Sequence, residues 1–323
     1  MMQGVVSAFS ALATVAMIEE CLMESALLKM YYSRLLQTIE TERNLSGEQV
    51  LEFHLFSFLV TIEYQSRIAW KNQLLVGGED GVLTVLDPGG SEKDPVLLEQ
   101  PIGRPIIDIL VGEFLPSLGS TKLEEMFSHQ MQEHAYNMCT VPSPTVHQLL
   151  VQSVGCVLTL FQGDQCVFSR SPLPALHPGP LSYCYPSSSL VTSNEGHLHS
   201  VKFSLLAGLG NTGKRVTFDW TFNLGDTCVD MAMEDTPTIQ ASIVCLCRYN
   251  VFCLTTGGTV RWQIRLERVG TALMVYNGGK ETLSIRLCVA TTSNNLLVFM
   301  DNKLMWNSQT EGTVVAIKLS NYK

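Results

Sequence analysis

The sequence contains few charged side chains for a chain of its length. Only 16% of its 323 residues are Asp, Glu, Lys or Arg, whereas about a quarter is usual in soluble domains. The acidic residues are in excess, which gives a formal net charge of −9. Such a charge disfavours non-specific binding of phosphate backbones, so we expect no nucleic-acid partner. The low charge favours a surface partly covered by protein partners, although strand-rich proteins also contain few Lys and Glu residues.

Long apolar runs and metal-binding spacings are also absent from the sequence. No stretch approaches about eighteen consecutive strongly apolar residues, which argues against a membrane-spanning helix. The ten cysteines include no Cys-x-x-Cys pair, and most of them fall on expected strands. Cys245 and Cys247 are two residues apart and therefore share one face of a strand. We expect reduced, buried cysteines, no disulfide framework, no metal site and no cofactor.

The sequence offers little that could carry catalysis. Gly208–Arg215 (GLGNTGKR) spells a P-loop except at its last position, where Arg215 replaces the Ser or Thr that would bind magnesium. A P-loop must open a helix, whereas the residues after Lys214 alternate like a strand, so we expect a flexible loop there. No Gly-x-Ser-x-Gly elbow occurs. We therefore predict no catalytic or cofactor-binding residues and no enzymatic activity.

Two pairs of polar residues leave an alternative open. His197 and His199 share one face of an expected strand, a spacing that can bind metal but has no third ligand nearby. A partly exposed strand is the simpler interpretation. Asp108 and Asp230 recur near the starts of expected inner strands. If such residues converged in a central pocket, the chain would be a propeller enzyme or a metal-binding module.

What the sequence does contain is alternation of period two in short runs. Between Lys214 and Glu267, apolar and polar residues alternate in runs separated by turn residues, which is typical of antiparallel strands. The same hairpin pattern recurs at Leu74–Leu86, Leu149–Phe161, Leu190–Val201, Val244–Leu254 and Leu287–Phe299. The last three intervals between these hairpins are about 40–55 residues, close to the spacing of propeller blades. We therefore predict an all-β fold, a β-propeller in preference to a β-sandwich.

The first residues differ from the rest of the chain. Residues 1–50 are rich in Ala, Leu, Met and Glu, contain no Pro, and show helical spacing from Leu22 to Leu36. We therefore predict an N-terminal α-helical extension, followed by the propeller at residues 51–323. A cleaved signal peptide, and hence a secreted propeller, is the alternative, but no basic segment precedes the apolar run.

Two blades of the predicted propeller are expected to be incomplete. The second blade begins at Ile106–Val111, but no hairpin follows between Phe114 and Ala135. Within that gap, Leu123–His134 (LEEMFSHQMQEH) is typical of a local helix. The last blade begins at Val314–Leu319 and has no hairpin after it. We therefore describe residues 51–323 as a truncated β-propeller, with exposed strand edges where blades are missing strands.

Several segments together resemble one known family. They are NQLLVGGEDGVLTVLDP (Asn72–Pro88), HAYNMCTV (His134–Val141), HPGPLSY (His177–Tyr183), SLVTSNEGHLHSVKF (Ser189–Phe203), GKRVTFDWTFNLGD (Gly213–Asp226), RYNVFCLTTGGTVRWQIRL (Arg248–Leu266) and NNLLVFMDNKLMW (Asn294–Trp306). In this order, they resemble the N-terminal propeller of the ninth Bardet–Biedl syndrome protein family, whose members are also called parathyroid-hormone-responsive B1 proteins. The resemblance runs from about Ser66 to Leu319 and leaves residues 1–50 unmatched.

The resemblance implies an incomplete seven-bladed β-propeller from a non-enzymatic scaffold subunit of the BBSome. This coat-like complex carries membrane proteins into and out of cilia. The implied partners are other BBSome subunits, with ciliary membrane-protein cargo and peripheral membrane association reached through the complex. The implied locations are the cytoplasm, the cilium and its membrane, and the centrosome or centriolar satellites. Because propellers often bind through loops on one rim, we take Asp87–Asp94 and Ala207–Lys214 as candidate binding loops.

Overall fold

The fold is described from a computed structural model. The described residues are 27–32, 59–66, 69–77, 80–87, 95–106, 108–110, 114, 128–133, 135–144, 146–170, 178–194, 196–208, 216–236, 239–277 and 284–320. They are mostly β-strand, as the alternation predicts. None of the helices among these residues has the length and apolar character needed to cross a membrane.

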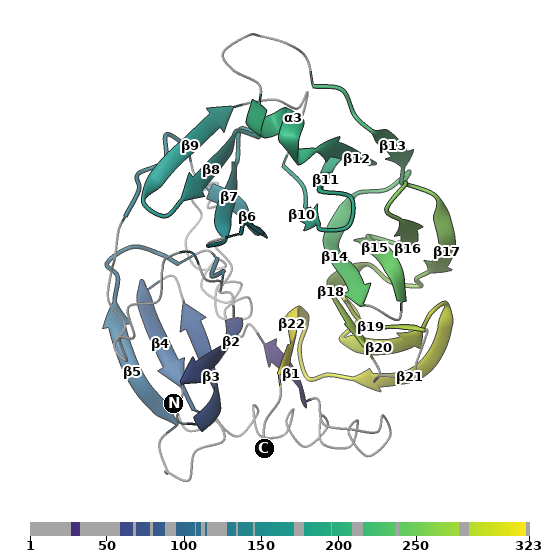
Figure 1. Cartoon of the computed structure of the whole chain (residues 1–323). Helices are drawn as coiled ribbons and strands as arrows, with labels where there is room; N and C mark the ends of the chain where they lie inside the picture. The colour runs from purple at the N-terminus through teal and green to yellow at the C-terminus, as the bar shows by residue number, and fades with distance from the viewer. Residues whose placement is uncertain are drawn as a thin grey trace, which may run out of the picture. The chain divides into compact units, whose positions relative to one another are not determined.

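Within these residues the chain forms five four-stranded antiparallel sheets, each with its strands in sequence order (Figure 1). The first contains β2 (Leu59–Ser66), β3 (Ala69–Gly77), β4 (Val82–Leu86) and β5 (Val96–Pro101). The second contains β6 (Ala135–Val141), β7 (Gln148–Ser153), β8 (Leu158–Gln162) and β9 (Gln165–Arg170). The third contains β10 (Leu181–Cys184), β11 (Ser189–Asn194), β12 (His197–Lys202) and β13 (Trp220–Asn223). Each sheet is a meander, the strand order of a propeller blade.

The fourth and fifth sheets repeat this plan. The fourth contains β14 (Cys228–Thr236), β15 (Ile239–Cys247), β16 (Asn250–Thr255) and β17 (Val260–Arg265). The fifth contains β18 (Gly270–Asn277), β19 (Ile285–Thr291), β20 (Asn295–Met300) and β21 (Lys303–Gln309). A further strand, β22 (Val314–Ser320), pairs antiparallel with β1 (Leu27–Tyr32). The single helix of the described residues is the short α3 (Phe203–Gly208), which follows β12.

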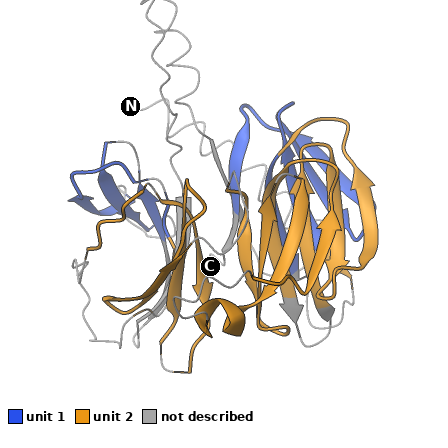
Figure 2. Ribbon diagram, turned by 90° about the horizontal axis from the view of Figure 1, so that it is seen from above, with its two compact units in different colours: residues 1–109, 271–282, 286–323 blue, residues 110–270, 283–285 orange. Residues whose placement is uncertain are grey.

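The chain divides into two compact units (Figure 2). One unit, residues 110–270 and 283–285, holds the second, third and fourth sheets. In it, β10 contacts both β6 and β14, so the first strands of the three sheets are neighbours. Two apolar clusters fill this unit. One includes Leu150, Leu160 and Leu190, and the other includes Leu198, Ile243 and Leu254. Together they bury the middle strands of the sheets and leave the fourth strands as edges.

The other unit consists of residues 1–109, 271–282 and 286–323. It holds the first sheet, most of the fifth sheet and the β1–β22 pair. Its apolar cluster is built by β18, β19 and β20 together with Val314 and Ile317 of β22. The hydroxyl of Thr271 donates a hydrogen bond to the carbonyl of Val314 at 2.6 Å. These contacts fix β22 against the fifth sheet.

The predicted hairpins are confirmed. The first turns at Asp80 and Gly81, where Gly81 has a φ of 70°, and the backbone of Arg104 lies where a β-carbon on Gly81 would point. A glycine is therefore required at that turn. The other hairpins correspond to β7–β8, β11–β12, β15–β16 and β19–β20, and each is antiparallel.

Several finer predictions are wrong. The predicted helix over Leu22–Leu36 contains strand β1, because the pairing with β22 outweighs local helix propensity; the rest of residues 1–50 lies outside the described residues. The described part of Ile106–Val111 forms no strand, and residues 128–133 of the predicted helix Leu123–His134 are not helical. The strand expected after Lys214 begins only at Trp220 in the described residues.

The resemblance implies seven blades, of which the second and the last were expected to be incomplete. The described residues hold five four-stranded sheets, because those between Pro101 and Ala135 form no strand and β22 pairs with β1. Most of the segment in which we placed the incomplete second blade lies outside the described residues, so that blade stays a prediction. β22 is confirmed as a strand beyond the last sheet.

Candidate interaction surface

The P-loop-like segment lies in a setting that does not suit phosphate binding. Gly208 is the last residue of α3, and residues 209–215 lie outside the described residues. Residues 216–218, which would open the phosphate-binding helix, are not helical. The helix precedes the motif, so its N-terminal amides lie at the far end from Gly208. The described residues on either side of the motif therefore lack the helix that a P-loop opens.

His197 and His199 share a face of β12, as predicted, and are integrated into the packing there. Their rings stack with centroids 6.1 Å apart, and the ring of His199 also stacks on Phe218 at 4.3 Å. His199 Nδ1 lies 3.0 Å from the Thr221 hydroxyl. Burial, and then the neighbouring His197, lower the pKa of His199 because they disfavour its charged form. Across the described ranges, no group of three or more His, Cys, Asp or Glu residues is arranged to hold a metal ion.

Asp108 and Asp230 each form a local backbone contact. A carboxylate oxygen of Asp108 accepts a hydrogen bond from the amide of Ile109 at 2.8 Å, and Asp230 accepts one from Met231 at the same distance. Asp230 lies on the inner strand β14, as predicted, whereas Asp108 lies outside any strand. The two residues belong to different units. Both carboxylates act as backbone acceptors, which is a structural role.

The two candidate loops are described only at their ends. The backbone amide of Asp87 donates a hydrogen bond to the carbonyl of Pro95 at 2.8 Å, so the ends of the Asp87–Asp94 loop are held together. The adjoining edge strand β5 is exposed along its whole length. Ala207 and Gly208 end α3, and the rest of Ala207–Lys214 lies outside the described residues. Whether either loop binds a partner stays a prediction.

The clearest surface feature among the described residues is the turn between β15 and β16. This turn contains Tyr249, which is 37% exposed to solvent. The guanidinium of Arg265 lies 5.6 Å from the centre of the tyrosine ring, and that of Arg248 lies 5.8 Å from it. Guanidinium groups at this range are attracted to the ring by its quadrupole. The three residues form an Arg–Tyr–Arg cluster at one end of the fourth sheet.

Backbone hydrogen bonds hold this turn in place. The amide of Tyr249 donates to Asp226 Oδ2 at 2.8 Å, and the carbonyl of Tyr249 accepts from Leu266 at 2.8 Å. The amide of Gly270 donates to the carbonyl of Arg248 at 2.8 Å. Three chain segments therefore meet at the turn, and a binding residue on it loses little backbone freedom when a partner docks.

The charge of this surface contrasts with that of the chain. We define the Tyr249 surface as Asp226, Arg248, Tyr249, Arg265, Glu267 and Arg268, which are exposed or half-buried. It contains three arginines and two carboxylates, so it is locally positive on a chain whose formal net charge is −9. Tyr and Arg are the residue types enriched at binding hot spots. Such a surface suits a partner that presents carboxylates beside an apolar or aromatic residue.

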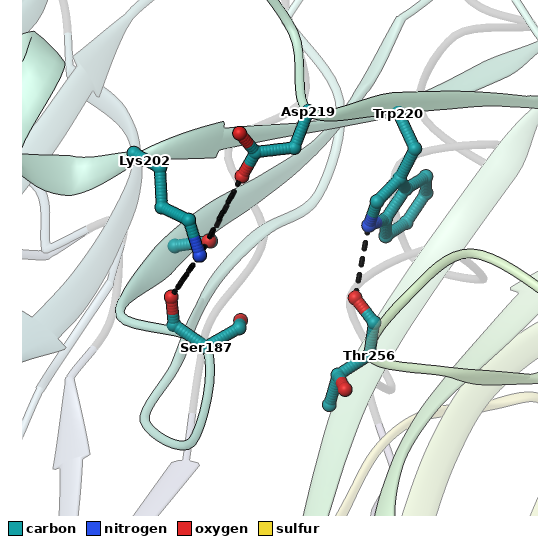
Figure 3. Close-up of polar contacts among 6 residues, drawn as sticks. Ser187, Lys202, Asp219, Trp220 and Thr256 are labelled. Carbon is teal, nitrogen blue, oxygen red and sulfur yellow. Dashed lines mark hydrogen bonds and ion pairs between the residues drawn. The ribbon is translucent and has the colours of Figure 1, made fainter.

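A second exposed tyrosine provides a comparison in the same unit. Tyr185, 67% exposed, lies in the β10–β11 turn. Beside that turn, Lys202 Nζ donates to the carbonyl of Ser187 at 2.6 Å and lies 3.8 Å from Asp219 (Figure 3). No arginine–ring contact is found for Tyr185 among the described residues. Tyr185 is therefore a matched control for Tyr249, because it is exposed on a turn but lacks the guanidinium pair.

The sequence-based predictions missed the Tyr249 surface. The hairpin at Val244–Leu254, which contains Tyr249, was predicted only as a structural element. The signal available was an Arg-Tyr pair in a hairpin turn followed by Arg265 and Arg268, which are unusual in a chain with few charges. Their convergence depends on Asp226 and Leu266, which are distant in sequence from Tyr249, so local patterns could not reveal it.

Comparisons with known proteins place the chain in one family. A family model described as PTHB1 N-terminal matches residues 118–323. The chain is 38% identical over 280 residues to Protein pthb1 homolog of Caenorhabditis elegans. This match covers 78% of the chain and 37% of that protein. The chain is 25% identical over 301 residues to Protein PTHB1 of Homo sapiens, covering 77% of the chain and 34% of that protein. The chain thus spans little more than a third of the curated relatives it matches.

The fold is similar to that of a solved structure. The crystal structure of BBS1N in complex with ARL6DN, soaked with mercury, superposes with a TM-score of 0.58 at 15% sequence identity. The similarity covers 78% of this chain and 80% of that chain. A crystal of the same complex soaked with lead gives a TM-score of 0.57. With the five meandering sheets, this similarity supports a propeller-like all-β fold.

Proposed function

This chain belongs to the PTHB1 N-terminal family, and from that premise we propose that it is a non-enzymatic BBSome scaffold acting through protein–protein contacts. The family match over residues 118–323 is the observation that carries the proposal. In this proposal the partners are other BBSome subunits, and membrane-protein cargo is reached indirectly, through the complex. The chain would work in the cytoplasm and at the cilium, its membrane and the centrosome or centriolar satellites.

The fold comparison supports a role in protein binding. The similar BBS1N structure was crystallised in complex with ARL6DN. A propeller-like fold of small four-stranded sheets exposes many turns and edge strands, which suits contacts with several proteins. The polar residues that we considered for catalysis instead serve local packing, as His199 does on Phe218. We therefore favour a scaffold over a propeller enzyme.

We further propose that the Tyr249 surface contacts a partner. Its tyrosine and arginines combine apolar area with directed positive charge, and the turn that carries them is held by Asp226 and Leu266. The partner surface would be acidic, because the arginines outnumber the carboxylates. Its attraction to this surface would weaken as salt is added.

The scaffold proposal can be tested by affinity purification of the tagged full chain from ciliated cells, followed by mass spectrometry. We expect several BBSome subunits in comparable amounts, because a scaffold recovers the complex as a unit. Recovery of chaperones alone, or of a secretory-pathway set, would contradict the scaffold role. A tagged, unrelated propeller of similar size controls for non-specific capture.

A further inference from the structure

Three thiols gather where β14 and β15 meet in the fourth sheet. Cys228 is the first residue of β14, and Cys247 is the last residue of β15. Cys245 lies two residues earlier on the same face, and all three belong to one apolar cluster. Cys228 is 7% exposed, whereas Cys245 and Cys247 are fully buried. Cys228 is therefore the thiol that a small molecule from solvent reaches first.

The strand register brings Cys228 and Cys247 directly opposite each other, and the register shifts just beyond this pair, between Cys228 and Asp230. The amide of Arg248 donates to the carbonyl of Thr227 at 3.2 Å, so that neighbouring pair is the hydrogen-bonded one. Because the two kinds of pair alternate in an antiparallel ladder, Cys228 and Cys247 form a non-hydrogen-bonded pair. Cα atoms in such pairs are about 4.5 Å apart with side chains close together. This separation falls within the range of about 4.4–6.8 Å that a disulfide spans.

The three thiols are also linked to one another. The side chains of Cys245 and Cys247 hydrogen-bond to Cys228, and these bonds, Cys245 first, lower the pKa of Cys228 well below its usual value. The same contact with Cys228, and then burial, raise the pKa of Cys247. Cys228 is the thiol whose charged form these contacts favour, and the thiolate is the form that oxidants attack.

We propose that Cys228 and Cys247 form a reversible disulfide when the protein meets a peroxide. The Cys228 thiolate attacks hydrogen peroxide, the O–O bond breaks, and Cys228 becomes a sulfenic acid while hydroxide leaves. The Cys247 sulfur then attacks the Cys228 sulfur, the S–S bond forms and the S–O bond breaks. Two electrons and two protons pass from the thiols to the peroxide, which yields two waters. A small thiol reverses the bond by exchange.

The position of this bond gives it a consequence at the surface. Cys247 directly precedes Arg248 and Tyr249, so the disulfide fastens the base of the Tyr249 turn to β14. The pair lies at the end of its ladder, beside the turn at Gly225 and Asp226. Strand ends open more readily than strand centres, which gives a peroxide access to Cys228. The disulfide itself does not depend on the proposed scaffold function.

Peptide mapping of the purified full chain tests this directly. The reduced protein is treated with hydrogen peroxide, remaining thiols are alkylated, and the chain is digested without reductant. We expect a cross-linked peptide pair containing Cys228 and Cys247, lighter by about 2 Da than the sum of its thiol forms and released by dithiothreitol. A pair joining Cys228 to Cys245, or unmodified Cys228 and Cys247 beside oxidised Cys166, would overturn the proposal.

Two cysteine variants test further whether Cys228 pairs with Cys247. Cys166→Ser removes the exposed thiol of β9 and should leave the cross-link in full. Cys247→Ala should abolish it and leave Cys228 as a sulfenic acid that a dimedone probe traps. If the Cys247→Ala chain does not fold, the wild-type map with the Cys166→Ser control still decides the question. Persistence of the same −2 Da change in a folded Cys247→Ala chain would contradict the pairing.

Discussion

Gly258 and Trp220 show how a single residue constrains the fourth sheet. Gly258, in the β16–β17 turn, has a φ of 81°, and a β-carbon there would meet the ring of Trp220. That ring is held in place because Trp220 Nε1 donates to the carbonyl of Thr256 at 2.9 Å (Figure 3). The backbone and the ring therefore both demand a glycine at this position.

We accordingly predict that Gly258→Ala lowers the free energy of unfolding by about 1–3 kcal/mol. Urea unfolding followed by tryptophan fluorescence measures this change. The adjacent Gly257→Ala is the matched control, because a β-carbon at Gly257 meets only the Thr255 hydroxyl, at 3.7 Å. Equal effects of the two substitutions would show that Trp220 does not pack on Gly258 as described.

The buried tyrosine of β18 provides a pH-dependent test at the same scale. Tyr276 is 7% exposed, and its hydroxyl has no hydrogen-bond partner among the described residues. Burial raises the pKa of Tyr276 to about 12. The folded state therefore retains this proton where an unfolded chain releases it. The stabilisation is complete below pH 10, about the ordinary pKa, and is lost as the pH rises toward about 12.

We therefore expect the free energy of unfolding to fall by up to about 2 kcal/mol more in the wild type than in Tyr276→Phe between these pH values. Near neutral pH the variant should be as stable as the wild type or slightly more stable, because it lacks the unsatisfied hydroxyl. Chemical unfolding of both chains at several alkaline pH values measures the difference. Parallel pH profiles would show that Tyr276 does not ionise differently in the folded state.

At the scale of the element, each sheet divides into buried middle strands and an exposed outer strand. Along β16, the first five residues are buried, whereas Ile264 is the one buried residue of β17. Leu254 of β16 is fully buried in the cluster shared by the third and fourth sheets, and Val260 of β17 is 40% exposed. We expect Leu254→Ala to cost about 2–5 kcal/mol of stability and Val260→Ala no more than about 0.5 kcal/mol. Thermal unfolding of the two variants tests this division, and similar losses would contradict it.

Elements were predictable from the sequence where local and tertiary preferences agree. The hairpins ending in β4, β8, β12, β16 and β20 follow from alternation bounded by turn residues, and glycines such as Gly81 and Gly196 adopt the positive φ those turns need. The helix predicted over Leu22–Leu36 failed at β1, because its partner β22 is remote in sequence. The strand predicted before Trp220 failed, since β12 pairs only with Trp220–Asn223 of that segment although it continues to Lys202.

At the scale of the molecule, repetition made the fold class predictable while the interaction surface remained hidden. The regular spacing of the hairpins along the sequence predicts a series of similar four-stranded meanders. The Tyr249 surface, in contrast, needs Asp226, Tyr249 and Leu266 to meet from three separate segments. Its arginines stand out in a chain with few charges, but only the folded arrangement brings Arg248 and Arg265 to the ring of Tyr249. The family similarity, carried by ordered motifs, was available from sequence and agrees with the family match.

The most direct test of the scaffold account compares three tagged full chains in ciliated cells: the wild type, the double variant Tyr249→Ala/Arg265→Ala, and Tyr185→Ala. Partners recovered with each chain are quantified by mass spectrometry with stable-isotope labelling. We predict that the wild type and Tyr185→Ala recover the same BBSome subunits in equal amounts, and that the double variant loses at least one about tenfold or more. Undiminished recovery by a folded double variant would remove the Tyr249 surface from the account. Failure of the wild type to recover any BBSome subunit would contradict the scaffold function itself.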